Sequence, residues 1–96
     1  MSVSFDRTDG RVTVRLGGEF DLATAPRLSE VLAESDTDTV VDLAEVSFID
    51  SSTLQVFAST HRRLGEQGHK FVVRNPRANV RRVLEITDLD EWIEGG

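Results

Sequence analysis

The residues best suited to do chemistry are an acid and two serines, Asp50, Ser51 and Ser52, which follow an apolar run and precede an amphipathic one. This change of pattern predicts that the serine hydroxyls lie at the N-terminus of a helix and face water. Backbone N–H groups in a first helical turn lack partners within the helix and carry the positive end of its dipole, so they stabilise a phosphate group. The segment therefore indicates a serine whose phosphorylation would switch a protein surface.

A simpler role for these residues is capping, because Asp and Ser are preferred N-cap residues and one cap stabilises a helix by roughly 0.5–2 kcal/mol. Since one residue suffices, the redundancy favours a further function. A nucleophilic serine would need a base held by an orienting group, but His61 falls on a predicted helix and His69 precedes a predicted strand. The sequence has no G-x-S-x-G elbow, glycine-rich phosphate loop or metal-ligand spacing. We therefore expect no enzymatic activity, catalytic residue, cofactor or metal.

The elements that must position the serines alternate between strand and helix. Strand-type alternation on both sides of Asp9-Gly10 predicts a hairpin with a tight turn. Apolar residues at helical spacing, beginning with Leu22, predict a first helix that carries Pro26 in its first turn. The predicted strands cover 2–7, 11–16, 39–43 and 70–74, and the predicted helices cover 22–34, 51–64 and the residues from 76 onward. This order favours an α/β fold, with an antiparallel hairpin beside a mostly parallel sheet and helices on at least one face.

Local signals refine three of these elements. The uninterrupted Val40-Val41 pair is typical of a central strand buried on both faces. Asn75 and Pro76 are predicted to cap and begin the third helix, and a glycine at 65 or 68 is predicted to end the second. The second helix is expected to pack through Leu54, Phe57, Ala58, His61 and Leu64, with His61 half-buried, and the tail is expected to pack on the sheet through Leu89, Trp92 and Ile93.

Composition limits the class of protein. The 96 residues suit a single domain, 1–96, and the absence of cysteine excludes disulfides, thiol catalysis and cysteine-zinc sites. No apolar run approaches the roughly 20 residues needed to cross a bilayer, and no secretion signal is recognised, so we expect a cytoplasmic protein without membrane insertion.

Charge is distributed unevenly along the chain. The net charge of −6 disfavours nucleic-acid binding, but residues 61–82 hold 7 basic and 1 acidic side chains. This basic segment is either the solvated face of two helices or a patch for an acidic partner or a phosphate.

Two separated motifs resemble the STAS domain of bacterial anti-sigma factor antagonists. The first is GEFDLATA at 18–25, followed by Leu28, and the second is VDL at 41–43 with FIDSS at 48–52. The segment 86–93 is also similar to that family's ending. The resemblance spans nearly the whole chain and implies a four- or five-stranded mixed sheet flanked by three to four helices.

The resemblance also implies a function by partner switching. In such families the unmodified antagonist binds an anti-sigma factor and releases a sigma factor. The anti-sigma factor is itself a serine kinase that phosphorylates the serine directly after the acid, and a serine phosphatase reverses the reaction. By position the acceptor is Ser51, with Ser52 as the alternative one residue away. The expected partner-binding residues are Glu19, Asp21, Asp50, Ser51, Ser52, Thr53 and Gln55.

The chain departs from the family pattern at two of these positions. Thr53 stands where the family usually has glycine, and Gln55 replaces another commonly small residue. Thr53 either changes partner choice or phosphorylation, or is neutral variation on an exposed first turn. Two other functions stay open: an accessory subunit of a membrane lipid or anion transporter, and a nucleotide or small-ligand sensor that uses the basic segment.

Overall fold

In the computed structural model, which describes residues 1–94, the chain opens with an antiparallel hairpin of β1 (Ser2–Thr8) and β2 (Arg11–Phe20). Asp9 and Gly10 form the turn with φ values of 53° and 73°. Positive φ at both central residues is the geometry that a two-residue hairpin turn with the correct twist requires, and Asp-Gly adopts it readily. The hairpin predicted at this dipeptide is confirmed.

The hairpin continues into a mixed sheet of order β1-β2-β3-β4, in which β3 (Asp38–Ile49) and β4 (Phe71–Arg74) run parallel to β2. Ile93 adds a single parallel bridge to Val73 at the β4 edge. The predicted mixed sheet is therefore confirmed. The central strand β3 extends well beyond the predicted 39–43, and Val40 and Val41 are both buried as expected.

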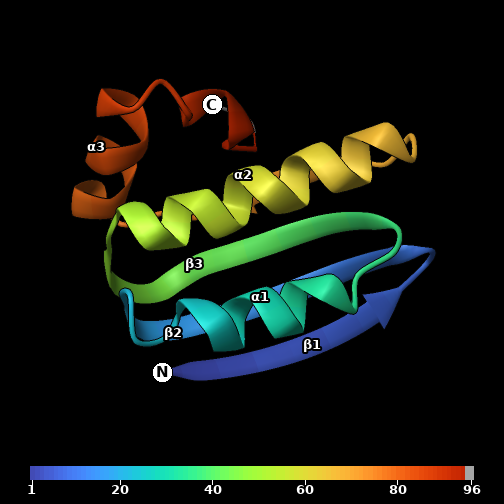
Figure 1. Ribbon diagram of the computed structural model, residues 1–96, viewed down its shortest axis with the longest axis horizontal. Helices are drawn as coiled ribbons and strands as arrows, with labels where there is room; N and C mark the ends of the chain where they lie inside the picture. Colours follow the sequence, from blue (N-terminus) through green and yellow to red (C-terminus); the bar gives the residue numbers. More distant parts are fainter. Residues whose placement is uncertain (95–96) are drawn as a thin grey trace.

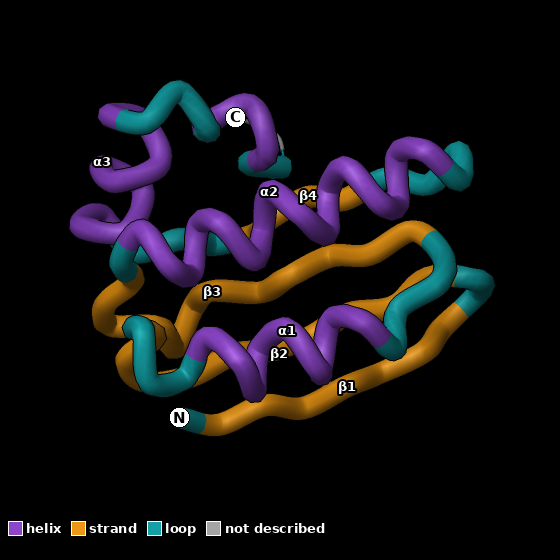
Figure 2. Tube along the Cα trace, viewed as in Figure 1, coloured by secondary structure: helices purple, strands orange, loops and turns teal. Residues whose placement is uncertain are grey.

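Helices α1 (Ala25–Ala33) and α2 (Ser51–Glu66) lie side by side on one face of the sheet, as Figures 1 and 2 show. Helix α3 (Ala78–Ile86) lies near the end of the sheet at which α2 begins, and a short 3-10 helix, η1 (Asp90–Trp92), follows it. Among the helices of residues 1–94, none is both long and apolar enough to cross a membrane.

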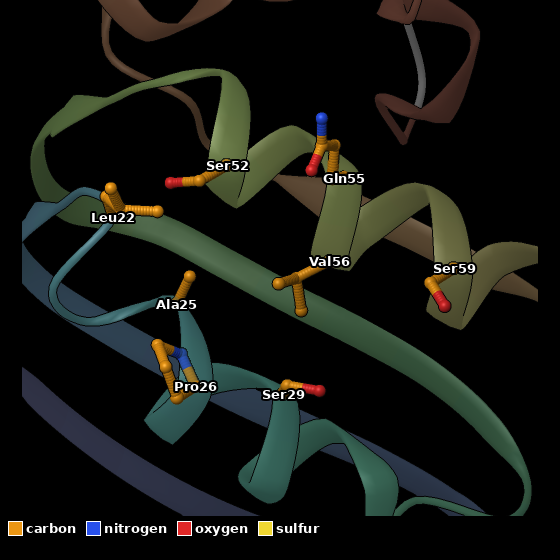
Figure 3. A pocket seen from close by; sticks show the side chains of 8 residues that line it. All are labelled: Leu22, Ala25, Pro26, Ser29, Ser52, Gln55, Val56 and Ser59. Carbon is orange, nitrogen blue, oxygen red and sulfur yellow. The ribbon is translucent and has the colours of Figure 1, made fainter.

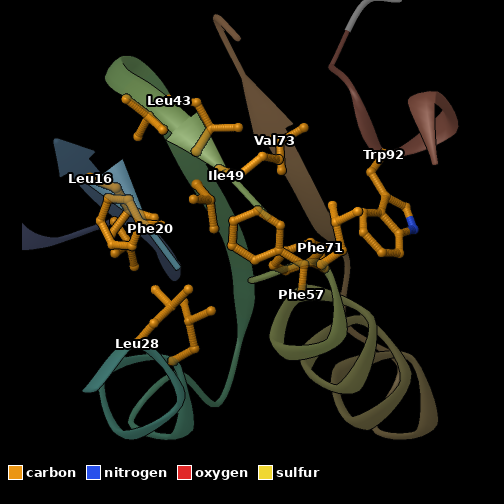
Figure 4. Close-up of a cluster of buried hydrophobic side chains, with 14 of the residues drawn as sticks. Leu16, Phe20, Leu28, Leu43, Ile49, Phe57, Phe71, Val73 and Trp92 are labelled. Atoms are coloured by element: carbon orange, nitrogen blue, oxygen red, sulfur yellow. The ribbon is translucent and has the colours of Figure 1, made fainter. Parts of the chain in front are cut away.

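The core fills the space between this sheet face and the helices (Figure 4). Alternate residues of β2, namely Val12, Val14 and Leu16, point into it, which is the period-2 pattern of a half-buried strand. The large buried side chains around them come from strands β2, β3 and β4 and from helices α1, α2 and η1. They are Phe20, Leu28, Leu43, Ile49, Phe57, Phe71, Val73 and Trp92. Burial of each such side chain contributes about 1.5–3 kcal/mol to folding, so the core fixes how α2 lies on the sheet.

The face that α2 buries differs in part from the prediction. Leu54, Phe57 and Leu64 are buried as expected, but Ala58 is exposed, and the remaining buried positions are Thr53 and Thr60. Positions 53, 57, 60 and 64 lie on one stripe of a helix, which leaves Ala58 beyond its edge. His61 is exposed rather than half-buried, and its ring centroid lies 5.5 Å from that of Trp92.

The ends of α2 and α3 show which local signals decide helix boundaries. Helix α2 ends at Glu66, and Gly68 follows with φ of 81°, so the C-terminal glycine predicted at 65 or 68 is Gly68. Helix α3 begins two residues later than predicted, because Arg77 is its extended N-cap and its Nε donates to the Ala44 carbonyl at 2.9 Å. The prediction that Asn75 and Pro76 begin this helix is therefore wrong.

The C-terminal tail packs on the sheet as predicted. Trp92 and Ile93 are buried, and Leu89 packs against the core from a partly buried position. The Glu94 N–H donates to the Val73 carbonyl at 2.8 Å, which extends the bridge at Ile93 by one hydrogen bond. The tail thus closes the β4 edge of the sheet.

Candidate functional site

Asp50 forms the N-cap of α2. Strand β3 ends at Ile49, and Asp50 has an extended backbone with φ −122° and ψ −175°. Its Oδ1 accepts the backbone N–H groups of Ser52 at 3.0 Å and Thr53 at 3.2 Å, and it also accepts the Ser52 hydroxyl at 2.5 Å. One carboxylate oxygen of Asp50 therefore accepts from two of the backbone N–H groups that have no partner within the helix. Neither serine is needed as the N-cap.

These hydrogen bonds stabilise the charged form of Asp50. The bond from the Ser52 hydroxyl lowers the pKa of Asp50 below its ordinary 3.8, and the N–H groups of Thr53, Ser52 and Leu22 lower it further, while desolvation partly offsets them. Asp50 is therefore ionised at neutral pH, and it carries a fixed negative charge beside the serines.

The two serines differ in what their hydroxyls do. Ser51 is exposed, and its hydroxyl has no hydrogen-bond partner within residues 1–94. Ser52 is half-buried, and its hydroxyl is held by Asp50. The expectation that both hydroxyls face water is thus right for Ser51 and wrong for Ser52, because Asp50 engages the second one.

Thr53 lies inside the protein, so its predicted place on an exposed first turn is wrong. The residue is 0% exposed, and its Oγ1 donates to the carbonyl of Phe20 at 3.0 Å. It belongs to the stripe of α2 that faces the sheet, which explains its burial. Thr53 therefore cannot touch a partner directly, although it was predicted among the partner-binding residues.

Asp21 shapes the loop between β2 and α1. Its Oδ1 accepts the backbone N–H groups of Ala23 at 3.0 Å and Thr24 at 3.3 Å, and its own N–H donates to the Thr24 hydroxyl at 2.9 Å. The preceding residue, Phe20, accepts the Asp50 N–H at 3.2 Å. The structure thus brings the Asp21 loop and the serine segment together, which agrees with their place in one partner-binding site that the resemblance implied.

Glu19 and Gln55 are both exposed near these residues, Glu19 at the end of β2 and Gln55 on the second turn of α2. Glu19 pairs in register with Phe48, which is 46% exposed. Six of the seven predicted partner-binding residues therefore lie at this edge with side chains at least partly accessible. Glu19, Ser51 and Gln55 are exposed, and Asp21, Asp50 and Ser52 are half-buried.

A shallow groove of about 390 Å³ runs between α1 and α2 beside the serines (Figure 3). Leu22 lies at its edge and is 75% exposed. The other lining residues come from the two helices: Ala25, Pro26, Ser29, Ser52, Gln55, Val56 and Ser59. The groove offers a partner small polar groups around a few apolar ones.

The sequence-based prediction missed Leu22, which it assigned to the apolar face of the first helix. The helix begins at Ala25, and Pro26 occupies its first turn. Since proline is favoured in the first turn, this position was the signal that Leu22 precedes the helix. Phe48 was missed as well, because its strand was predicted to end at residue 43.

The positions of the two histidines relative to the serines can be compared directly. Within residues 1–94, no three His, Asp or Glu side chains gather to hold a metal. His69 Nδ1 lies 3.6 Å from Asp38 Oδ1 at the opposite end of the sheet. His61 lies ten residues after Ser51 on α2, about 15 Å along the helix axis.

A comparison with known families identifies the chain. A family model described as "Mlab, STAS domain" matches residues 3–94. This match covers nearly the whole chain. The chain belongs to the STAS domain family.

Similar proteins include several antagonists of anti-sigma factors. The anti-sigma-B factor antagonist of Bacillus subtilis is 31% identical over 97 residues, which covers 98% of this chain and 89% of that protein. An anti-sigma factor antagonist from Mycobacterium paratuberculosis is 32% identical, with a TM-score of 0.83 over 97% of this chain and 82% of that one.

The fold is also that of SpoIIAA. The unphosphorylated form of that anti-sigma factor antagonist gives a TM-score of 0.81 at 22% identity, over 96% of this chain and 85% of that one. The phosphorylated form from Bacillus gives 0.78 at 21% identity, over 96% and 88%. The STAS fold implied by the sequence motifs is confirmed.

Three cations of the basic segment serve this STAS fold. Arg63 donates to the carbonyls of Leu32 at 2.8 Å and Ser35 at 2.9 Å, where α1 ends. Arg74 pairs with Glu94 at 3.2 Å, and Arg77 donates to β3. These contacts favour a structural role for these three arginines over a phosphate-binding one.

Proposed function

We propose that this STAS domain is an anti-sigma factor antagonist that is switched off by phosphorylation of Ser51. In its unmodified form it binds an anti-sigma factor that is a serine kinase, and a sigma factor is released. A serine phosphatase acting on phospho-Ser51 restores binding. Kinase, phosphatase and sigma factor act in the cytoplasm, which is where we place this domain.

The observation that carries this proposal is the free hydroxyl of Ser51 beside an N-cap that is already complete. Asp50 by itself forms the N-cap of α2, so the helix does not need the Ser51 hydroxyl. An exposed hydroxyl at the start of a helix is accessible to a kinase, whereas the Ser52 hydroxyl must first leave Asp50. The geometry therefore favours Ser51 over Ser52 as the acceptor.

The effect of the phosphate follows from the charges around it. Asp50 already engages the N–H groups of Ser52 and Thr53, so these two donors are not free to stabilise the phosphate, contrary to the expectation from the sequence. The phosphate instead lies beside an ionised carboxylate. A phosphoserine adds about −1.5 to −2 charge, which raises the negative potential of the surface that the partner contacts. Because α2 keeps its cap, the domain stays folded, and the conflict arises with the partner.

The experiment uses the anti-sigma kinase and sigma factor of the same organism. Wild-type chain is titrated into their complex, and sigma release is measured before and after incubation with Mg-ATP. We expect wild type to release sigma and to lose this activity with ATP. Ser51→Ala should release sigma under both conditions, and Ser52→Ala should behave as wild type. Failure of the wild-type chain to bind any anti-sigma kinase would contradict the proposal.

The same experiment distinguishes the other two functions. A transporter accessory subunit would form a stable stoichiometric complex that Ser51→Asp leaves unchanged. A nucleotide sensor would be stabilised against heat by nucleotide without any partner. Neither function accounts for an accessible serine next to a complete cap.

A further inference from the structure

Two hydrogen bonds from the α2 end converge on one carbonyl group of β2. The Phe20 carbonyl accepts the backbone N–H of Asp50 at 3.2 Å and the hydroxyl of Thr53 at 3.0 Å. Phe20 is fully buried and is the last residue of β2. Its carbonyl therefore links the strand that leads into the Asp21 loop with the helix that carries Ser51.

The second buried threonine of α2 makes a different kind of contact. Thr60 is 6% exposed, and its hydroxyl donates to the Val56 carbonyl of its own helix at 2.8 Å. That bond joins residues four apart and holds no other element. The Thr53 bond joins residues 33 apart, so its loss would act on the relative position of two segments.

The segments joined by Thr53 form the two sides of the candidate site. Asp21 directly follows Phe20, and the exposed Leu22 comes next, opposite Ser52 across the groove (Figure 3). The Leu22 N–H also contributes to the lowered pKa of Asp50, which places the loop close to the cap. Thr53 itself is buried and has no surface for a partner.

We propose that Thr53 is a positioning residue for partner recognition. Its hydroxyl holds the β2–α1 loop at a fixed place relative to Ser51, so that an anti-sigma kinase meets Asp21, Leu22 and Ser51 as one preformed surface. The affinity of a partner that binds only this arrangement is proportional to the fraction of free molecules that hold it. This inference rests on the proposed function.

The test compares Thr53→Val with Thr60→Val, since each removes one buried hydroxyl from the same helix and keeps nearly the same shape. The first readout is amide hydrogen exchange of the free chain at residues 21–24. We expect about fivefold faster exchange in Thr53→Val, as loss of one hydrogen bond predicts, and no change there in Thr60→Val. Thr53→Ser, which keeps the hydroxyl, should restore slow exchange.

The second readout is the dissociation constant of the anti-sigma kinase from each variant. Thr53→Val should weaken binding by a factor of at most about five, because the lost hydrogen bond sets the upper limit on how far the competent fraction falls, whereas Thr60→Val and Thr53→Ser should match wild type. Equal binding by the two valine variants, or unchanged loop exchange in Thr53→Val, would overturn the inference. If wild type binds no anti-sigma kinase, the proposed function fails and the recognition role fails with it, but the exchange experiment still decides whether Thr53 anchors the loop.

Discussion

The two ends of the β2–β3 strand pair use their polar side chains differently. At the end where the strands begin, Thr37 Oγ1 donates to the Gly10 carbonyl at 2.7 Å. The Arg63 guanidinium donates to the carbonyls of Leu32 and Ser35 at 2.8 and 2.9 Å, where α1 leaves acceptors unpaired. These side chains complete the fold, and we call this region the closed end.

At the other end, which we call the serine end, the polar groups form a frame around one free hydroxyl. Asp50, Ser52 and Thr53 direct their hydrogen bonds toward one another and toward Phe20, while Ser51 points its hydroxyl to solvent. The comparison teaches that polar residues at a helix end indicate a function only where one of them makes no hydrogen bond that the fold needs. Changes at the closed end should therefore alter stability, and changes at the serine end should alter binding.

The largest effect is expected from a negative charge at the serine end. Ser51→Asp should weaken binding to the anti-sigma kinase at least about 100-fold, because like charges across an interface cost several kcal/mol. The variant should fold, since an acid is favourable in a first helical turn. Thr8→Asp adds the same charge at the closed end, and calorimetric titration should show wild-type affinity for it. Similar losses for both variants would remove the distinction between the two ends.

A change at the closed end should affect stability alone. Arg63→Met removes two hydrogen bonds from a charged group and should lower the free energy of unfolding by about 2 kcal/mol. The neighbouring Arg62 is exposed, and Arg62→Met should stay within about 0.5 kcal/mol of wild type in urea unfolding. Both variants should bind the kinase normally. A weakened complex with Arg63→Met would show that the closed end contributes to recognition.

Removing one carboxylate from each end tests the comparison with single acidic residues, Asp21 at the serine end and Glu34 near the closed end. Asp21→Ala loses two hydrogen bonds that shape the loop, and it should weaken kinase binding about tenfold. Glu34→Ala removes an exposed acid near the closed end and should leave the dissociation constant unchanged. Equal losses in a binding titration would argue against a site at the serine end.

The smallest effect concerns the charge of Asp50, whose contribution to stability is present at neutral pH and lost in acid. Asp50→Asn keeps a capping oxygen but removes the charge, so its stability relative to wild type reports the charge alone. Because the folded pKa of Asp50 lies below 3.8, its charge stabilises the fold above that pH. The advantage of wild type in urea unfolding should be constant near neutral pH and shrink as the pH falls through the folded pKa. An advantage that grew in acid would contradict the assigned shift.

Sequence alone predicted the features that local chemistry decides. The Asp9-Gly10 turn, Pro26 in the first turn of α1 and the start of α2 after Asp50 each depend on the backbone preferences of one or two residues. The family motifs added the four- or five-stranded mixed sheet and the grouping of Asp21 with the serines in one expected partner-binding site.

The features that were missed depend on contacts between distant segments. Thr53 is buried because α2 turns that side toward Phe20; its spacing of four residues from Phe57 places it on the buried stripe, but its hydrogen bond to Phe20, 33 residues away, has no local signal. Likewise α3 begins late because Arg77 reaches the Ala44 carbonyl, 33 residues away. Strand β3 was predicted too short because register shifts between β2 and β3 let exposed residues, such as Phe48, lie within a paired strand.

The central claim is that one serine at this end of the sheet carries the switch. The most direct measurement is mass-spectrometric mapping of the phosphate after the wild-type chain is incubated with its anti-sigma kinase and Mg-ATP. We predict a single phosphate on Ser51, with Ser52 unmodified because its hydroxyl is bound to Asp50. Phosphate on Ser52 alone, or a chain that stays unmodified while it forms a complex with the kinase, would contradict this account.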